Sequence, residues 1–376
     1  MYTDKLKFKN GKFKIMQIAD VQDIFPVAKD SIKLITLAIE KEKPDLVVFT
    51  GDQVYGLDPL IRKGKTENNV KGVIEAFIAP LEKKGIPFAV TFGNHDAQCG
   101  IPNNEQYAFY KQSDFCVTGE NMSDKNPGTS KITIYKDDTA AFDLFLFDSG
   151  GQGLTGEYYP VSEEQLMWFS AERAVEKDNG NKPNFIVFQH IPVPEFYNVI
   201  KKVSRFTKGA VEAFRTHKNE FYVLPEEIIK AGGFMHESPA TPDQNSGEFD
   251  LLKRDGGCLA VAVGHDHINS FVSEFEGIKL IYTQCAGFNV YGPKRQRGVR
   301  IFELDENDTG KFDTHTVTFD ELTKDKIEKP VKEFVLTHIP SSMEQVKRIA
   351  AVGGITIAVA GVAGYIAVKG KKKISN

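Results

Sequence analysis

The first hundred residues alternate short apolar segments with stretches of helical periodicity, and this alternation constrains the fold more than any other feature. The segments at 13–20, 45–50 and 87–92 predict strands, because apolar residues dominate them as in buried strands. The apolar spacing over 31–43 and 70–84 predicts the two intervening helices. A β-α-β-α-β order implies a parallel sheet with right-handed crossovers.

Polar residues that can bind a ligand stand where each predicted strand ends. In chain order these residues are Asp20, Gly51-Asp52 and Gly93-Asn94-His95-Asp96. Ligands of open parallel sheets bind beyond the carboxyl ends of the strands. The three motifs are therefore expected to meet at one edge of the sheet.

Two later apolar strands bring histidines to the same edge. Residues 185–188 precede His190, and residues 258–263 precede Gly264-His265-Asp266-His267. With His95, four of the 8 histidines therefore follow apolar strands. Each motif alone also fits ordinary turn chemistry, because Gly, Asn and Asp favour turns. Together, carboxylate, amide and imidazole groups at one rim predict a site for two metal ions that share one aspartate.

The remainder of the chain predicts a second sheet and an insertion. Further strands are expected at 131–135, 142–147, 278–283, 298–304 and 312–319. The last three are spaced as antiparallel neighbours and are expected to complete the second sheet. Residues 195–250 have weak periodicity and many polar side chains, which indicates a long insertion near the site. The fold class is therefore α/β.

In this order the motifs resemble those of the calcineurin-like metallophosphoesterases, whose pattern is D-x-H, G-D, G-N-H-D or G-N-H-E, H and G-H-x-H. The resemblance covers 13–304, and residues 92–96, 190–192 and 264–267 are most similar to the small purple-acid-phosphatase-like phosphohydrolases. It implies a four-layer α-β-β-α sandwich of two mixed sheets in a catalytic domain over 1–319. It also implies a metal-dependent hydrolase of phosphate monoesters or diesters.

The resemblance also implies roles for individual residues. The first metal would be held by Asp20 and His267, the bridge would be Asp52, and the second metal would be held by Asn94, His190 and His265. Two such ions would lower the pKa of a bridging water, whose hydroxide attacks phosphorus in line. His95, supported by Asp96, would be the catalytic imidazole that stabilises phosphoryl charge or protonates the departing oxygen.

The first motif departs from the family pattern, because Gln22 stands where histidine is usual. Its amide oxygen can still bind a metal. The first site would then hold three oxygen donors and one nitrogen, which weakens zinc and favours manganese, iron or magnesium. Alternatively, Asp23 or water takes the place of Gln22. A catalytically impaired, membrane-tethered and metal-stabilised interaction module is therefore the alternative function.

The C-terminal residues predict a membrane tether. Residues 320–348 are charged and indicate a linker or stalk, and 349–368 form a run of 20 residues without a charge. That length spans a bilayer, so a transmembrane tail anchor followed by a basic tail at 369–376 is expected; a buried or docking helix is the alternative. Small residues spaced four apart in this run favour helix-mediated self-association. The lysine-rich N-terminus lacks a secretory signal, so the catalytic domain is expected at the cytoplasmic membrane face.

Composition excludes several other classes of protein. A net charge of −4 and a pI near 6.1 argue against bulk nucleic-acid binding. The four cysteines lie far apart without a CxxC pair, which argues against a zinc knuckle and predicts reduced thiols. The basic cluster at 294–300 is interpreted either as a solvated face or as a surface that steers phosphate to the site.

Overall fold

A five-stranded mixed sheet contains the strands predicted from the first hundred residues. The structure, a computed structural model, describes residues 2–338 of the 376. In this sheet β2, β3 and β4 are parallel, and β16 and β17 extend the sheet antiparallel beyond β2, in the order β17-β16-β2-β3-β4. The strands are β2 (Lys12–Ile18), β3 (Leu46–Thr50), β4 (Phe88–Thr91), β16 (Gly298–Asp305) and β17 (Phe312–Thr318).

The second sheet has nine strands, in the order β1-β6-β7-β8-β13-β15-β14-β12, with β5 paired to β6. Its centre, from β7 to β15, is parallel and its flanks contain antiparallel pairs. The strands are β1 (Leu6–Lys7), β5 (Glu120–Ser123), β6 (Asn126–Lys136), β7 (Thr139–Phe147), β8 (Asn184–Gln189), β12 (Phe234–Met235), β13 (Cys258–Val263), β14 (Asn269–Phe275) and β15 (Ile278–Tyr282).

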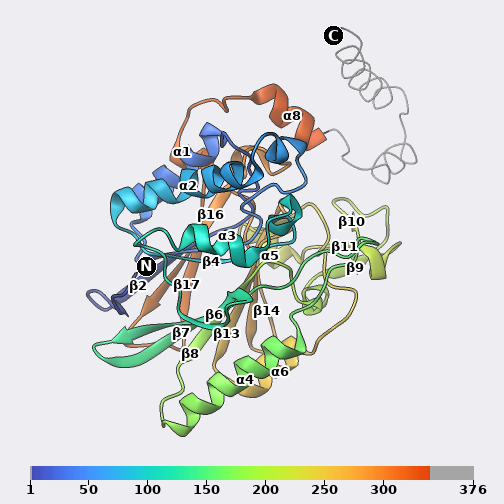
Figure 1. Cartoon of the computed structure of the whole chain (residues 1–376). Coiled ribbons are helices and arrows are strands. Elements are labelled where there is room, and N and C mark those ends of the chain that lie inside the picture. Colours follow the sequence, from blue (N-terminus) through green and yellow to red (C-terminus); the bar gives the residue numbers. More distant parts are fainter. Residues whose placement is uncertain (1, 339–376) are drawn as a thin grey trace.

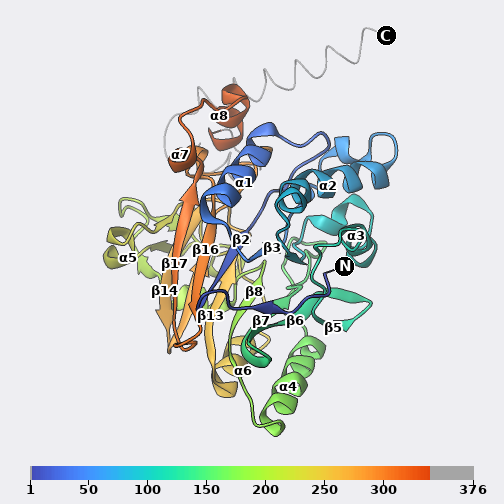
Figure 2. The same cartoon turned by 90° about the vertical axis from the view of Figure 1, so that its left-hand side faces the viewer.

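The two sheets pack face to face, and helices cover their outer faces. Figures 1 and 2 show α1 and α2 on one side of the sheets and α4 and α6 on the other. The helices are α1 (Lys29–Glu42), α2 (Thr66–Lys84), α3 (Asn103–Tyr110), α4 (Glu163–Asp178) and α6 (Glu248–Asp255). The expected α-β-β-α layering is therefore present in the described residues.

Strand β3 shows how the sequence produces these layers. All five of its residues are buried, as expected for a strand covered on both faces. Val47 and Phe49 face the helices, whereas Leu46 and Val48 belong to the core between the two sheets. The period-2 alternation of a strand thus supplies apolar side chains to two separate cores.

The strands after residue 277 differ from the prediction in their partners. Strands β16 and β17 join the first sheet rather than the second, because β16 pairs with β2, with Phe302 opposite Ile15. Strand β15 is parallel to β13 and antiparallel to β14. Strand β14 was not expected from the sequence, because it contains polar residues; Asn269, Ser270 and Ser273 are nevertheless buried. Period-2 patterns identify strands but do not select partners.

The insertion over 195–250 contains several short elements. A three-stranded antiparallel sheet forms in the order β10-β11-β9, and α5 follows it. These elements are β9 (Lys201–Val203), β10 (Val211–Glu212), β11 (Phe221–Val223) and α5 (Glu226–Lys230).

Short 3-10 helices occur along the whole described chain, at Pro59–Arg62, Asp96–Cys99, Pro194–Asn198, Arg215–His217 and Lys294–Gln296.

The segment expected to be a linker contains α7 (Phe319–Leu322) and α8 (Pro330–His338). Its charged composition did not indicate that Glu333 of α8 is buried. The expected tail anchor over 349–368 and basic tail over 369–376 lie outside the described residues. Within residues 2–338, no helix combines the length and the apolar character needed to cross a bilayer.

Candidate metal centre

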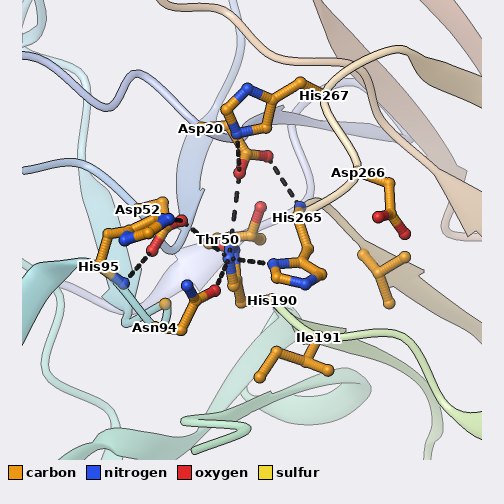
Figure 3. A network of polar contacts seen from close by, with 12 residues as sticks. Asp20, Thr50, Asp52, Asn94, His95, His190, Ile191, His265, Asp266 and His267 are labelled. Carbon is orange, nitrogen blue, oxygen red and sulfur yellow. Dashed lines mark hydrogen bonds and ion pairs between the residues drawn. The ribbon is translucent and has the colours of Figure 1, made fainter. Parts of the chain in front are cut away.

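The residues predicted from the strand ends meet at one rim of the two sheets (Figure 3). The donor atoms of Asp52, His190 and His265 lie within 4.8 Å of one another, and so do those of Asp20, Asp52 and His267. Both triads contain Asp52. The structure therefore places one carboxylate between two groups of metal-binding side chains.

The turns after the strands adopt backbone conformations that direct these side chains toward each other. Asp20, Asp52 and His265 have φ angles of 53°, 52° and 73°, in the left-handed region that short polar residues tolerate better than most. Gly93 is required by close packing, because a Cβ there would lie 2.3 Å from Asp52 Oδ1. The loop after β4 thus approaches the Asp52 carboxylate more closely than a side chain would allow.

One group of donors surrounds His190. Its Nε2 atom lies 3.2 Å from Asp52 Oδ2, 3.2 Å from Asn94 Oδ1 and 3.1 Å from His265 Nδ1. Its Nδ1 atom lies 3.0 Å from the carbonyl oxygen of Thr50. A proton on Nδ1 that is donated to this carbonyl leaves the Nε2 lone pair directed at the centre, as in metal-binding histidines.

The charges around this group favour a bound cation. Burial lowers the pKa of His190, but the carboxylates of Asp52 and Asp20 raise it to about 10. Burial and the neighbouring His190 hold the pKa of His265 well below its ordinary value. His265 is therefore a neutral donor, while the carboxylates attract positive charge to the space between the rings.

A second group of donors surrounds Asp20. Its Oδ1 atom lies 3.5 Å from His267 Nε2, and its Oδ2 atom accepts a hydrogen bond of 2.9 Å from the backbone N–H of His265. The Nδ1 atom of His267 lies 3.0 Å from the carbonyl oxygen of Tyr291, whose ring stacks on His267 at 4.3 Å. His267 is thereby held with Nε2 facing Asp20.

Gln22 is buried, and its side-chain oxygen has no hydrogen-bond partner in the structure. Asp20 Oδ1 is also buried without a hydrogen-bond donor. Buried oxygens of this kind normally have a partner, and a cation supplies one. Asp23, the alternative ligand, is already engaged, because it accepts from the backbone N–H groups of Ile24 and Ala28. The structure therefore favours Gln22 over Asp23.

The geometry of Asp96 corrects its expected support of His95. The Asp96 carboxylate accepts four backbone N–H bonds of 2.8–2.9 Å, from Gly93 and from the turn at 52–54. The Nδ1 atom of His95 instead contacts Oε1 of Gln98. Asp96 therefore ties together the loops after β3 and β4, and an amide orients the His95 ring. Asp266, between the two histidines of the last motif, likewise turns away and accepts from the Ala240 N–H.

Three aromatic residues near the centre were not predicted from the sequence. The ring of Tyr158 meets His265 edge-on at 4.5 Å and stacks against Phe214 of the insertion at 5.5 Å. The ring of Tyr55 lies 6.0 Å from that of His95. These residues come from loops without periodicity, so the sequence carried no signal for them. They place aromatic rings against two of the site's histidines, His95 and His265.

The basic cluster at 294–300 does not match either of its two interpretations in full. Arg297 and Arg300 are buried. Arg297 pairs with Glu333 at 2.9 Å, and Arg300 donates to the carbonyl oxygen of Tyr282 at 3.1 Å. Neither guanidinium is a solvated charge or a phosphate-steering group, because Arg297 is paired with a carboxylate and Arg300 is hydrogen-bonded to neutral oxygens inside the fold.

Comparison with known proteins identifies the family. A family model described as calcineurin-like phosphoesterase matches residues 13–269. The chain belongs to this family. It is therefore a metallophosphoesterase, a class of phosphoric ester hydrolase, with the fold and the strand-end motifs described above.

Individual relatives are distant. The chain is 26% identical to a protein of Arabidopsis thaliana named "Probable inactive purple acid phosphatase 29", over 82% of this chain and 81% of the relative. It is 27% identical to "Phosphatase DCR2" of Saccharomyces cerevisiae, over 79% of this chain and 52% of the relative. Among solved structures, a dimetal phosphatase from Danio rerio aligns with 82% of this chain and 99% of that chain, at 14% identity and a TM-score of 0.48.

Proposed function

We propose that the chain hydrolyses phosphate monoesters or diesters at a dinuclear metal centre. In this assignment Asp20, Gln22 and His267 would hold the first metal, Asn94, His190 and His265 would hold the second, and Asp52 would serve both. The observation that carries the proposal is that two triads of donor atoms share Asp52. A carboxylate shared in this way can serve two adjacent cations.

The donor set fits two divalent or trivalent ions. The unpartnered oxygens of Asp20 and Gln22 are the atoms that a metal would satisfy, and they make the first site rich in oxygen. Such a site favours manganese, iron or magnesium over zinc. When bound, the two ions supply the charge that acidifies water and stabilises the attacking and leaving oxygens.

His95 is the residue best placed to act on the substrate. Its Nε2 atom lies 4.0 Å from Asp52 Oδ2, and its side chain is 21% exposed, whereas the side chains of His190 and His267 are at most 4% exposed. Contact of Nδ1 with the Gln98 amide oxygen assigns the donated proton to Nδ1. Nε2, close to the shared Asp52 carboxylate, is then the ring nitrogen left to contact a phosphate ester at the centre.

Hydrolysis of p-nitrophenyl phosphate and bis-p-nitrophenyl phosphate in the presence of Mn²⁺ tests the proposal. Turnover is expected for the wild type and is expected to fall at least a hundredfold in Asn94→Ala and His95→Ala. His236→Ala, at an exposed histidine, is the matched control and should keep wild-type turnover. No turnover by the wild type, or equal turnover by all variants, contradicts the enzyme hypothesis.

The second candidate is a catalytically impaired, metal-stabilised interaction module. Gln22 in place of the usual histidine favours it, and relatives in Arabidopsis thaliana bear names that include "probable inactive". Calorimetry with Mn²⁺, combined with the hydrolysis assay, separates the two candidates. The interaction module would bind two metals and gain thermal stability from them, yet would hydrolyse neither ester.

We further propose that the C-terminal run over 349–368 anchors the enzyme at the cytoplasmic membrane face. Support comes from the length of the run and its lack of charge. Fractionation of cells should place the full chain with membranes and a chain truncated at 338 in the soluble fraction. Digestion of the catalytic domain by protease added to intact cells contradicts the cytoplasmic orientation.

A further inference from the structure

The loop over residues 285–292 contacts the first-site histidine from two sides. The backbone N–H of Cys285 donates to the carbonyl oxygen of His267 at 3.1 Å. At the other end of the loop, the carbonyl oxygen of Tyr291 contacts His267 Nδ1 at 3.0 Å. The position and the ring orientation of His267 therefore depend on this loop.

The same loop contacts the backbone of the first motif. The N–H groups of Ala286 and Gly287 donate to the carbonyl oxygens of Ala19 and Asp20, at 2.9 and 3.1 Å. A Cβ on Gly287 would lie 1.7 Å from the carbonyl oxygen of Val21, so only glycine permits this approach. Val21 stands between Asp20 and Gln22, and the 285–292 loop thus supports all three proposed side-chain ligands of the first metal other than the bridge.

A buried arginine holds the loop from behind. Arg297 is fully buried, and its guanidinium donates to the carbonyl oxygens of Gly287 and Val290. The guanidinium also lies over the Phe288 ring, 4.9 Å from its centroid. A charge in this position requires an anionic partner, because burial without one is costly.

Helix α8 supplies that partner. Glu333 receives two hydrogen bonds from Arg297 Nη2, at 2.9 and 3.1 Å, and is itself buried. The next residue toward the N-terminus, Lys332, contacts Oδ1 of Asn289 in the loop, and Asn289 contacts Asp23 beside Gln22. Two successive side chains of α8 thus act on the 285–292 loop, Lys332 by direct contact and Glu333 through Arg297.

We propose that α8 positions the first metal site, with Glu333 acting through Arg297 and the 285–292 loop. Glu333 is a positioning residue, since it touches neither a proposed ligand side chain nor the substrate. The inference rests on the first-site assignment under the proposed function. Its consequence is selective: metal affinity at the first site depends on the docking of α8, whereas Asn94 and His190 of the second site follow β4 and β8, outside this chain of contacts. His265, the third ligand of the second site, meets the first site through its backbone N–H, which donates to Asp20.

Calorimetric titration of the metal-free full-length chain with Mn²⁺ alone tests the inference without any substrate. The wild type is expected to bind two Mn²⁺, one of them more weakly. Glu333→Gln and Glu333→Ala are expected to weaken one binding event at least tenfold and to leave the other within twofold. Lys332→Ala removes a contact without unpairing the buried arginine, and it should weaken the same event by a smaller factor.

Glu328→Gln is the matched control, because Glu328 pairs with Lys29 at 3.2 Å and is 38% exposed. It should bind both metals as the wild type does. If the Glu333 variants do not fold, Lys332→Ala carries the test. The inference is overturned if Glu333→Gln and Lys332→Ala bind both Mn²⁺ ions as the wild type does. It is also overturned if these variants weaken both binding events equally. A wild type that binds fewer than two Mn²⁺ instead contradicts the proposed function.

Discussion

Gly93 permits a direct prediction, because a single added methyl group would displace the proposed bridging ligand. The Cβ of an alanine at this position would lie 2.3 Å from Asp52 Oδ1 and 2.5 Å from Asp52 N, whereas ordinary contacts begin at 3.4 Å. Relief of the clash requires a shift of about 1 Å between the two loops. Backbone strain is not the cause, since Gly93 lacks the positive φ of Gly51.

A misplacement of about 1 Å in a catalytic site costs on the order of a hundredfold in rate. Gly93→Ala is therefore expected to lower kcat/KM for p-nitrophenyl phosphate about 100-fold, which corresponds to about 2.7 kcal/mol of transition-state stabilisation. The assay is made with saturating Mn²⁺, so that altered metal affinity does not limit the rate. Gly151→Ala is the control, because a Cβ there would meet nothing within 4 Å.

Urea unfolding of both variants separates displacement of the ligand from loss of the fold. The reasoning is refuted by a Gly93→Ala protein that keeps the wild-type unfolding midpoint and loses less than threefold in kcat/KM. The same loss of activity in Gly151→Ala would also refute it, because that residue contacts neither Asp52 nor its loop.

Three further predictions concern the first metal, the core and pH. Gln22→His restores the usual ligand and should raise the Zn²⁺ affinity of one site at least tenfold relative to Mn²⁺ in competition calorimetry; an unchanged preference would show that residue 22 is not a ligand. Arg173→Met removes a buried guanidinium that donates to Asp255 and Glu176, although Lys182 and Lys131 still pair with these carboxylates. Urea unfolding should therefore show a loss of about 1–3 kcal/mol, and an unchanged free energy of unfolding would contradict it. Burial raises the pKa of Glu248 from 4.5 to about 8, so the folded state binds the extra proton between these values. The wild-type free energy of unfolding should therefore fall as pH rises through this window, and equal pH slopes for wild type and Glu248→Gln would contradict this.

The strand-end motifs could be predicted from sequence because their signal is local. An apolar run too short for a helix predicts a strand, and a following Gly-Asp or Gly-Asn-His marks the turn where that strand ends. Because the strands are parallel, the turns at their carboxyl ends lie at the same edge of the sheet. The site residues Asp20, Asp52 and His190 were found in this way, and the structure places their donor atoms together.

Other features could not be predicted, because they depend on contacts between segments far apart in the chain. Strand β16 pairs with β2 of the first sheet. The period-2 alternation of its sequence would suit a strand in either sheet, so the pattern could not identify this partner. Asp96 follows His95 directly, yet its carboxylate binds backbone groups of the turn at 52–54. A charged segment such as α8 shows no core pattern when only one of its residues, Glu333, is buried with a distant arginine.

By itself the sequence determined the positions of the strands that carry the site residues, the metal-binding residue types and the substitution at Gln22, since each is read from residues that are neighbours in the chain. Only the tertiary structure decided that Gln22 keeps an unpartnered oxygen while Asp23 is engaged, and that Glu333 supports the first site through Arg297. The physical reason is that a hydrogen bond depends on the distance between two atoms in space. The partners of these side chains were set when separate segments of the chain closed around one rim.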